Sequence, residues 1–171
     1  MIFSKKKIVI VTATRADYGK LKSIILKIQK NKKFNTKIFV TGMHNLDLYG
    51  KTVIELKKDN IKNLHIYKNQ SSRDSMNQIL INTIQGFSKF LSKENPDLVI
   101  VHGDRIEPLA CAISALLSKT KIAHIEGGEV SGTIDEILRH AISKLSHTHF
   151  VSNTIAKKRL IQMGENKKNI F

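Results

Sequence analysis

The chain has 171 residues and carries 29 Lys and Arg against 14 Asp and Glu, a formal net charge of +15. Hydrophobic residues make up 41% of it, which excludes a disordered tail and suits one domain, residues 1–171, with a buried core. No apolar run approaches the roughly 20 residues that span a membrane, and the single cysteine excludes an internal disulfide.

Short runs of β-branched and apolar residues predict six strands. They cover residues 7–12, 37–41, 64–67, 98–101, 122–125 and 149–151. The run at 98–101 is apolar at each position, which suits a strand buried on both faces of a parallel sheet. The last three residues resemble the start of another strand.

Segments with apolar residues three and four positions apart predict the helices between these strands. They cover residues 17–31, 52–59, 72–93, 108–117, 133–145 and 154–163. Pro108 suits a first helical turn, and Thr133 with Glu136 has the spacing of a capping box. Strands that alternate with helices predict an α/β fold, a doubly wound, Rossmann-like parallel sheet with right-handed crossovers.

Polar and ionisable residues follow four of the predicted strands. They lie at 14–20 after the first strand, 42–44 after the second, 103–105 after the fourth, and 126–129, leading to Asp135, after the fifth. Ligands of doubly wound sheets bind outside the carboxyl ends of the strands. We therefore expect these four loops to form one polar crevice.

The charged residues of these loops allow more than one interpretation. Arg15 and Lys20 are either solvated or bind an anion, and the anion is favoured because cations at a helix start oppose the helix dipole. Asp104 either faces the crevice, pairs with Arg105 or caps the next helix. Glu126 ends a buried strand, where a carboxylate needs a partner or a raised pKa.

Several other residues have a simple structural interpretation. His102 and His124 lie within apolar strands and are predicted to be hydrogen-bonded core residues, and Cys111 a small core residue of its helix. His44 fits a loop histidine bonded to the backbone as well as a ligand-binding residue. Asp135 gains from the helix dipole wherever its side chain points.

Common cofactor and nucleic-acid motifs are missing. No Gly-x-Gly-x-x-Gly follows the first strand, no phosphate loop occurs, and no helical His pair has metal-ligand spacing, so we expect neither a cofactor nor a metal. The chain lacks Trp and any Arg cluster interleaved with aromatic residues, so we expect no nucleic-acid partner despite the charge. A non-catalytic, basic nucleotide- or nucleic-acid-binding module stays open as an alternative.

Four segments occur in a specific order: TRADY at 14–18, TGMH at 41–44, VHGDR at 101–105, and HIEGGEVSGTIDE at 124–136, followed by Arg139 and His140. Together they resemble the hydrolysing UDP-N-acetylglucosamine 2-epimerases of sialic acid biosynthesis. The resemblance implies the GT-B fold, in which the active site lies between two Rossmann-like domains. This chain would be the N-terminal domain, and on its own it is expected to be inactive, because a catalytic histidine and most nucleotide contacts lie in the second domain.

The resemblance also implies a mechanism without a cofactor. UDP is eliminated across C1–C2 of the sugar to give 2-acetamidoglucal, and water then adds to give N-acetylmannosamine. By position in the matching segments, the catalytic carboxylates are Asp104, Glu126 and Asp135. By the same matching, Arg15 and Lys20 lie near the nucleotide phosphates, His44 and Arg105 line the sugar site, and Asp17 is a further nucleotide- or substrate-binding position.

Two questions stay open within this resemblance. Relatives acting on nucleotide-linked N,N′-diacetylbacillosamine, for legionaminic acid, carry the same motifs, so the sugar is not determined. Self-association into a homo-oligomer is also undecided. The expected partner is a UDP-sugar, with no membrane, and the expected compartment is the cytoplasm, because the sequence starts without the apolar core of a secretory signal.

Overall fold

The computed structural model describes residues 4–171, so the part of the expectation about a secretory signal that concerns Met1 to Phe3 lies outside the described residues. Six strands form one parallel sheet in the order β3-β2-β1-β4-β5-β6. Their bounds are β1 Lys6–Thr12, β2 Phe34–Val40, β3 Leu64–Ile66, β4 Leu98–His102, β5 Lys121–Ile125 and β6 Thr148–Phe150. This is the doubly wound, Rossmann-like order that the alternating pattern predicts.

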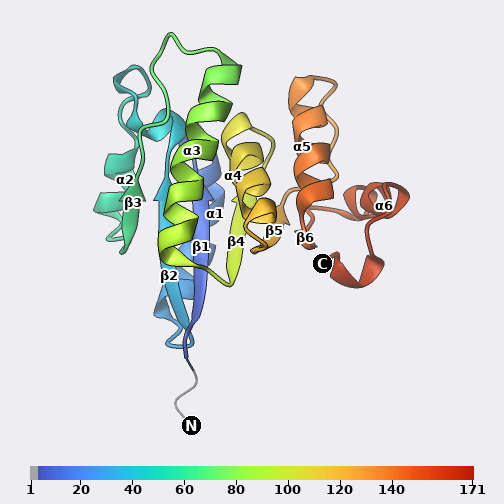
Figure 1. Ribbon diagram of the computed structural model, residues 1–171. Helices are drawn as coiled ribbons and strands as arrows, with labels where there is room; N and C mark the ends of the chain where they lie inside the picture. The colour runs from blue at the N-terminus through green and yellow to red at the C-terminus, as the bar shows by residue number, and fades with distance from the viewer. Residues whose placement is uncertain (1–3) are drawn as a thin grey trace.

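Helices cover both faces of the sheet (Figure 1). Their bounds are α1 Arg15–Lys30, α2 Val53–Lys58, α3 Met76–Glu94, α4 Ile106–Leu117, α5 Ile134–Leu145 and α6 Thr154–Gln162. Helices α3, α4 and α5 pack on one face and α1 and α2 on the other, so two hydrophobic cores sandwich the sheet.

Alternation along the central strand explains the two cores. In β1, Val9 and Val11 join the core under α3 and α4, whereas Ile8 and Ile10 join the core under α1. Ile10 lies beside Ile38 of β2 on one side and Ile100 of β4 on the other. The chain reverses its winding direction between β1 and β4, and at such a point the loops above the strands separate into a crevice.

Two local predictions turn out differently in the structure. Thr133 caps α5 without a side-chain hydrogen bond. The Glu136 carboxylate instead accepts from the amides of Ser131 and Gly132, at 2.8 Å each, so the predicted Thr133–Glu136 capping box is wrong. Helix α3 begins at Met76 rather than at residue 72, because Ser75 caps it.

The end of the chain pairs with the edge of the sheet. Ile170 forms a parallel bridge with His149 of β6, and the amide of Phe171 donates to the His149 carbonyl at 2.9 Å. The prediction that residues 169–171 start another strand holds only for this single bridge at Ile170, because Asn169 is the last residue of a 3-10 helix, Lys167–Asn169.

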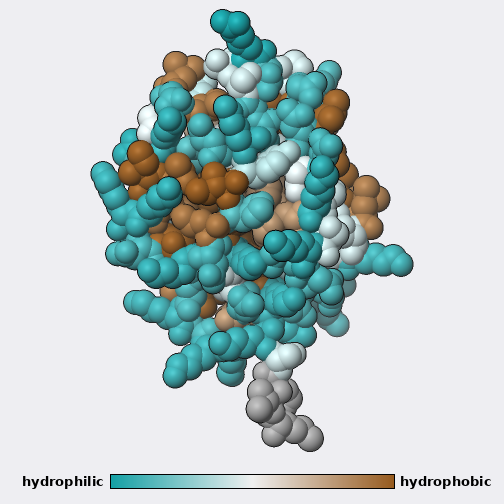
Figure 2. All heavy atoms as spheres, turned by 60° about the vertical axis from the view of Figure 1, so that its left-hand side comes forward, coloured by the Kyte–Doolittle hydropathy of each residue, from teal (hydrophilic) through white to brown (hydrophobic). Residues whose placement is uncertain are grey.

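The face of the molecule in Figure 2 is mainly hydrophilic. Figure 2 shows one face of the molecule, on which polar side chains surround several separate apolar patches. No helix within residues 4–171 has the length and apolar character needed to cross a membrane.

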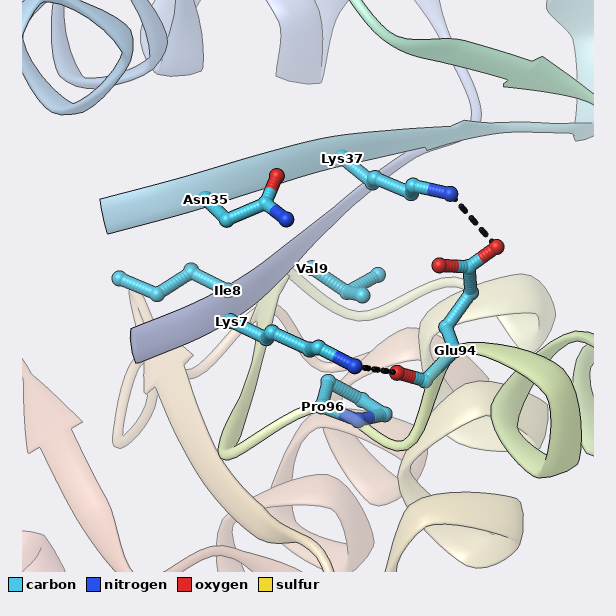
Figure 3. A pocket seen from close by; sticks show the side chains of 7 residues that line it. All are labelled: Lys7, Ile8, Val9, Asn35, Lys37, Glu94 and Pro96. Carbon is cyan, nitrogen blue, oxygen red and sulfur yellow. Dashed lines mark hydrogen bonds and ion pairs between the residues drawn. The ribbon is translucent and has the colours of Figure 1, made fainter. Parts of the chain in front are cut away.

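Charge pairing fills one cavity at the amino-terminal edge of the sheet, between the starts of β1 and β2 and the end of α3. Lys37 pairs with the Glu94 carboxylate at 2.6 Å, and Lys7 donates to the Glu94 carbonyl oxygen at 3.0 Å (Figure 3). The cavity between them has a volume of about 10 Å³, room for about one water molecule. A small-molecule site therefore has no space there.

Candidate active site

A pocket of about 390 Å³ opens at the carboxyl ends of the strands, above the point where the winding reverses. The loops after β1, β2, β4 and β5 and the first turns of α5 contribute to it. Its lining residues are Thr14, Ala16, Asp17, Lys20, Met43, His102, Gly103, Asp104, Arg105, Glu126, Asp135 and Arg139. The three carboxylates singled out from the sequence, Asp104, Glu126 and Asp135, thus share one cavity.

Glu126 is held by two partners at the end of β5. Its carboxylate accepts from the Lys20 ammonium at 2.6 Å and lies 3.3 Å from Nε2 of His102. Partial burial acts to raise the pKa of Glu126, but the hydrogen bond and charge of Lys20 and the hydrogen bond of His102 outweigh it and lower the pKa. Glu126 is therefore ionised at neutral pH.

His102 belongs to the pocket as well as to the strand. It is the last residue of β4, its side chain is 7% exposed, and burial lowers its pKa although Glu126 acts in the opposite direction. The ring is therefore neutral at neutral pH and faces the Glu126 carboxylate. The apolar strand pattern predicted only a core role, and the signal in favour of the site was the position of His102 directly before the Gly103 turn.

Asp104 and Arg139 form an ion pair across the pocket, from the β4 loop to α5. Asp104 therefore does not pair with Arg105, one of the alternatives left open by the sequence. Burial lowers the pKa of Arg139, and its Nε and Nη1 atoms have no hydrogen-bond partner among the described residues. Arg139 lies four residues after Asp135, so the two side chains project from the same face of α5. This spacing is the sequence signal that could have identified Arg139 as a pocket residue.

Asp17 forms part of the pocket floor, through a capping box at the start of α1. Its carboxylate accepts from Thr12 Oγ1 and from the amides of Ala13 and Thr14, at 2.9 and 3.1 Å. Burial raises the pKa of Asp17 to about 6, although these hydrogen bonds act to lower it.

His44 lies beneath this floor rather than in the pocket wall. Its side chain is fully buried, with Nε2 2.9 Å from Thr12 Oγ1 and Nδ1 2.7 Å from Thr52 Oγ1. Burial lowers its pKa to about 4, so the ring is neutral. This differs from the expectation that His44 lines a sugar site, because two threonine hydroxyls occupy its ring nitrogens. Its Nε2 atom lies 3.9 Å from Asp17 Oδ1, and the Thr12 hydroxyl connects the two side chains.

The remaining predicted cations lie in two adjoining cavities. Lys20 and Arg105 line the main pocket, whereas Arg15 lines a neighbouring cavity of about 270 Å³ that shares Thr14, Ala16 and Met43 with it. The Arg15 side chain is 75% exposed and pairs with Glu55 at 3.1 Å. Chemically, the pocket combines cations that can bind a phosphate with fixed carboxylates that can accept a proton or face a developing positive charge.

The comparisons with known proteins agree with this chemistry. Residues 26–171 match the sequence profile of the family described as UDP-N-acetylglucosamine 2-epimerase. The chain is 44% identical over 165 residues to the UDP-N-acetylglucosamine 2-epimerase of Neisseria meningitidis serogroup B, covering 96% of this chain and 44% of that protein. It is 43% identical over 169 residues to a hydrolysing UDP-N,N′-diacetylbacillosamine 2-epimerase of Legionella pneumophila, covering 97% and 45%.

Comparison with solved structures indicates the same family. A Neisseria meningitidis UDP-GlcNAc 2-epimerase bound to UDP-GlcNAc superposes with a TM-score of 0.88 at 25% identity, over 96% of this chain and 45% of that one. A lipopolysaccharide galactosyltransferase at 16% identity and a TM-score of 0.67 shares the fold, in agreement with the expected N-terminal half of a GT-B architecture. The chain spans about 44% of the length of the curated relatives it matches. On the profile match and these identities, the chain belongs to the UDP-N-acetylglucosamine 2-epimerase family.

Proposed function

We propose that the chain is the N-terminal domain of a hydrolysing UDP-N-acetylglucosamine 2-epimerase. The reaction eliminates UDP across C1–C2 to give 2-acetamidoglucal and then adds water to give N-acetylmannosamine. The observation that carries the proposal is the single pocket that Asp104, Glu126 and Asp135 line together with the cations Lys20, Arg105 and Arg139. We propose the cytoplasm as its compartment.

In the proposed reaction, the cations of the pocket act on the diphosphate and its carboxylates act on the sugar. Lys20 and Arg105 both line the pocket, and we assign both to the diphosphate, although the resemblance places Arg105 at the sugar. Charge-assisted hydrogen bonds from these two cations would hold the diphosphate and stabilise it as it leaves. As the C1–O bond breaks, positive charge grows at C1, and an ionised carboxylate facing it stabilises that charge.

The three carboxylates differ in their ion-pair partners, and we assign them to different steps of the reaction. Asp104 is fixed in place by Arg139, which favours an electrostatic role. Glu126 is ionised and held by a neutral histidine and one lysine, which suits a base for the C2 proton once the lysine turns to the phosphate. Asp135 lines the pocket and has no ion-pair partner among residues 4–171. We therefore assign it the transfer of a proton to or from the intermediate.

The experimental test traces the hydrogen at C2 and the release of UDP. The complete translation product of the gene is incubated with UDP-N-acetylglucosamine in D₂O, and UDP and sugar are followed by NMR. The proposal expects free N-acetylmannosamine with deuterium at C2, because the C2 proton is lost and replaced from solvent. Formation of UDP-N-acetylmannosamine without UDP release would show a non-hydrolysing epimerase, and no reaction would refute the proposed activity.

A second sugar is favoured by two relatives. Proteins of Legionella pneumophila and Campylobacter jejuni that are 43% and 39% identical to the chain bear the name of hydrolysing diacetylbacillosamine 2-epimerases. The same chemistry on a nucleotide-linked N,N′-diacetylbacillosamine is therefore the alternative. Comparing kcat/KM for the two activated sugars decides between them.

A further inference from the structure

Another acidic residue lies next to the pocket, beside Arg105, and has no role in the scheme above. Glu107, in the first turn of α4, is fully buried, and neither of its carboxylate oxygens has a hydrogen-bond partner among residues 4–171. A buried carboxylate without such bonds is costly, so its place in the fold calls for a specific reason. Burial raises the pKa of Glu107, and the charge of Arg105 opposes this.

Arg105 is the cation beside Glu107. Its Nε lies 3.5 Å from Glu107 Oε2 and is itself buried, with no other partner among the described residues. The Arg105 side chain is nevertheless 41% exposed and lines the pocket. One edge of the guanidinium therefore faces Glu107, which leaves the remaining N–H groups for the pocket.

The backbone makes room for this carboxylate. Gly42 has φ +62°, and a Cβ there would lie 2.8 Å from Glu107 Oε1 and 2.7 Å from the Ala13 carbonyl oxygen. Arg105 is also the N-cap residue of α4, where a cation opposes the helix dipole, and Glu107 in the first turn offsets it.

We propose that Glu107 is a positioning residue that holds the Arg105 guanidinium against the pocket wall, so that its free N–H groups bind the diphosphate of the nucleotide. The inference rests on the proposed function, because it takes the phosphates as the ligand of Arg105. Glu107 itself is too deeply buried to touch substrate.

The test measures UDP binding by calorimetry on the complete translation product, so that it does not depend on turnover. Glu107→Met removes the acceptor and keeps the length of the side chain, and it is expected to raise the Kd for UDP about tenfold, within the range of coupled neighbours. Glu107→Gln restores an acceptor for Nε–H and is expected to stay within about twofold of wild type. In an Arg105→Gln background, Glu107→Met should add less than about twofold.

A matched control separates positioning from general loss of a buried acid. Glu165 is 12% exposed, pairs with Lys144 and His149 and lies outside the pocket. Glu165→Gln is expected to leave the Kd unchanged. An unchanged Kd in Glu107→Met, or an equal loss with and without Arg105, would overturn the proposal.

Three further outcomes are informative. If Glu107→Met does not fold, the Nε–H resonance of Arg105 carries the test, since a chemical shift identical in wild type and Glu107→Gln would show that the side chains do not interact and refute the inference. If wild type binds UDP but does not release it from UDP-N-acetylglucosamine, the proposed function fails while the role of Glu107 in UDP binding stands. If wild type does not bind UDP, both fail.

Discussion

At the scale of single residues, the site depends on which charges are neutralised before substrate arrives. Glu126 and Asp104 each have a cationic partner, whereas His102 and His44 are buried and neutral. Glu126 is therefore ionised, and the rings of His102 and His44 are uncharged, at neutral pH. This arrangement suits a reaction in which negative groups face a sugar that becomes positively charged.

The ionised state of Glu126 leads to a mutational prediction. Glu126→Gln keeps the shape but removes the charge and the proton acceptor, and is expected to lower kcat about 10²- to 10⁴-fold. UDP release by the complete translation product measures it. Glu129→Gln is the matched control, because Glu129 lies outside the pocket and accepts from Asn153 at 2.7 Å. Equal activity of the two variants would contradict a catalytic role for Glu126.

The buried histidines predict a loss of stability in acid. His124 is fully buried, lies 2.8 Å from the Gly103 carbonyl oxygen and 3.1 Å from Ser143 Oγ, and its pKa is lowered to about 4 by burial. Below about pH 6.5 the His124 ring is protonated in the unfolded chain but stays neutral in the folded chain. The free energy of unfolding therefore falls as the pH drops from about 6.5 to 4. The contribution is on the order of 3 kcal/mol.

Two measurements check this. In urea unfolding between pH 4 and 7, His124→Gln should show a shallower acid loss than wild type, and the His124 ring resonance should not titrate between pH 5.5 and 7.5. Asp17 acts in the opposite direction, since its raised pKa of about 6 makes the folded state bind a proton more tightly than the unfolded state above about pH 4. A His124 titration midpoint near 6.5 would refute the prediction.

At the scale of elements, tight approaches hold the loops that carry the carboxylates. Gly128 follows Glu126 by two residues, has φ +81°, and a Cβ there would lie 2.5 Å from the Ala156 carbonyl oxygen of α6. The β5 loop therefore packs directly on the backbone of α6. Because Glu126 lies at the start of the same loop, we expect this packing to fix its direction.

Substitution of Gly128 and of Gly19 by alanine is expected to change stability in opposite directions. Gly128→Ala is expected to destabilise the fold by about 1–3 kcal/mol or more, because the positive φ and the contact with a carbonyl oxygen both disfavour a side chain. Gly19 lies inside α1 with nothing within 4 Å of an added Cβ, so Gly19→Ala should stabilise by about 0.5–1 kcal/mol. Unfolding free energies from urea titrations measure both, and shifts of the same sign would contradict the structure.

At the scale of the whole molecule, the proposed function implies that the pocket is one wall of a larger site. The chain covers about 44% of the relatives' length, and its pocket is lined from one sheet only. We predict that the 171-residue chain alone turns over UDP-N-acetylglucosamine far more slowly than one per second, because water is not excluded and the charges are screened. A UDP-release assay measures it, and turnover near one per second would refute the prediction.

The sequence by itself determined the sheet, its parallel strands and the loops that carry the polar residues. Strand and helix periodicity reports burial on one or both faces, and the carboxyl ends of parallel strands meet at one edge whatever the side chains are. It did not determine the pairing of charges, because hydrogen bonds between residues 35 or 106 positions apart have no periodic signal. Only the tertiary structure assigned Arg139 to Asp104, moved His44 beneath the floor, brought His102 to Glu126 and revealed Glu107 behind Arg105. These outcomes depend on distances and burial, which packing sets and chain order does not.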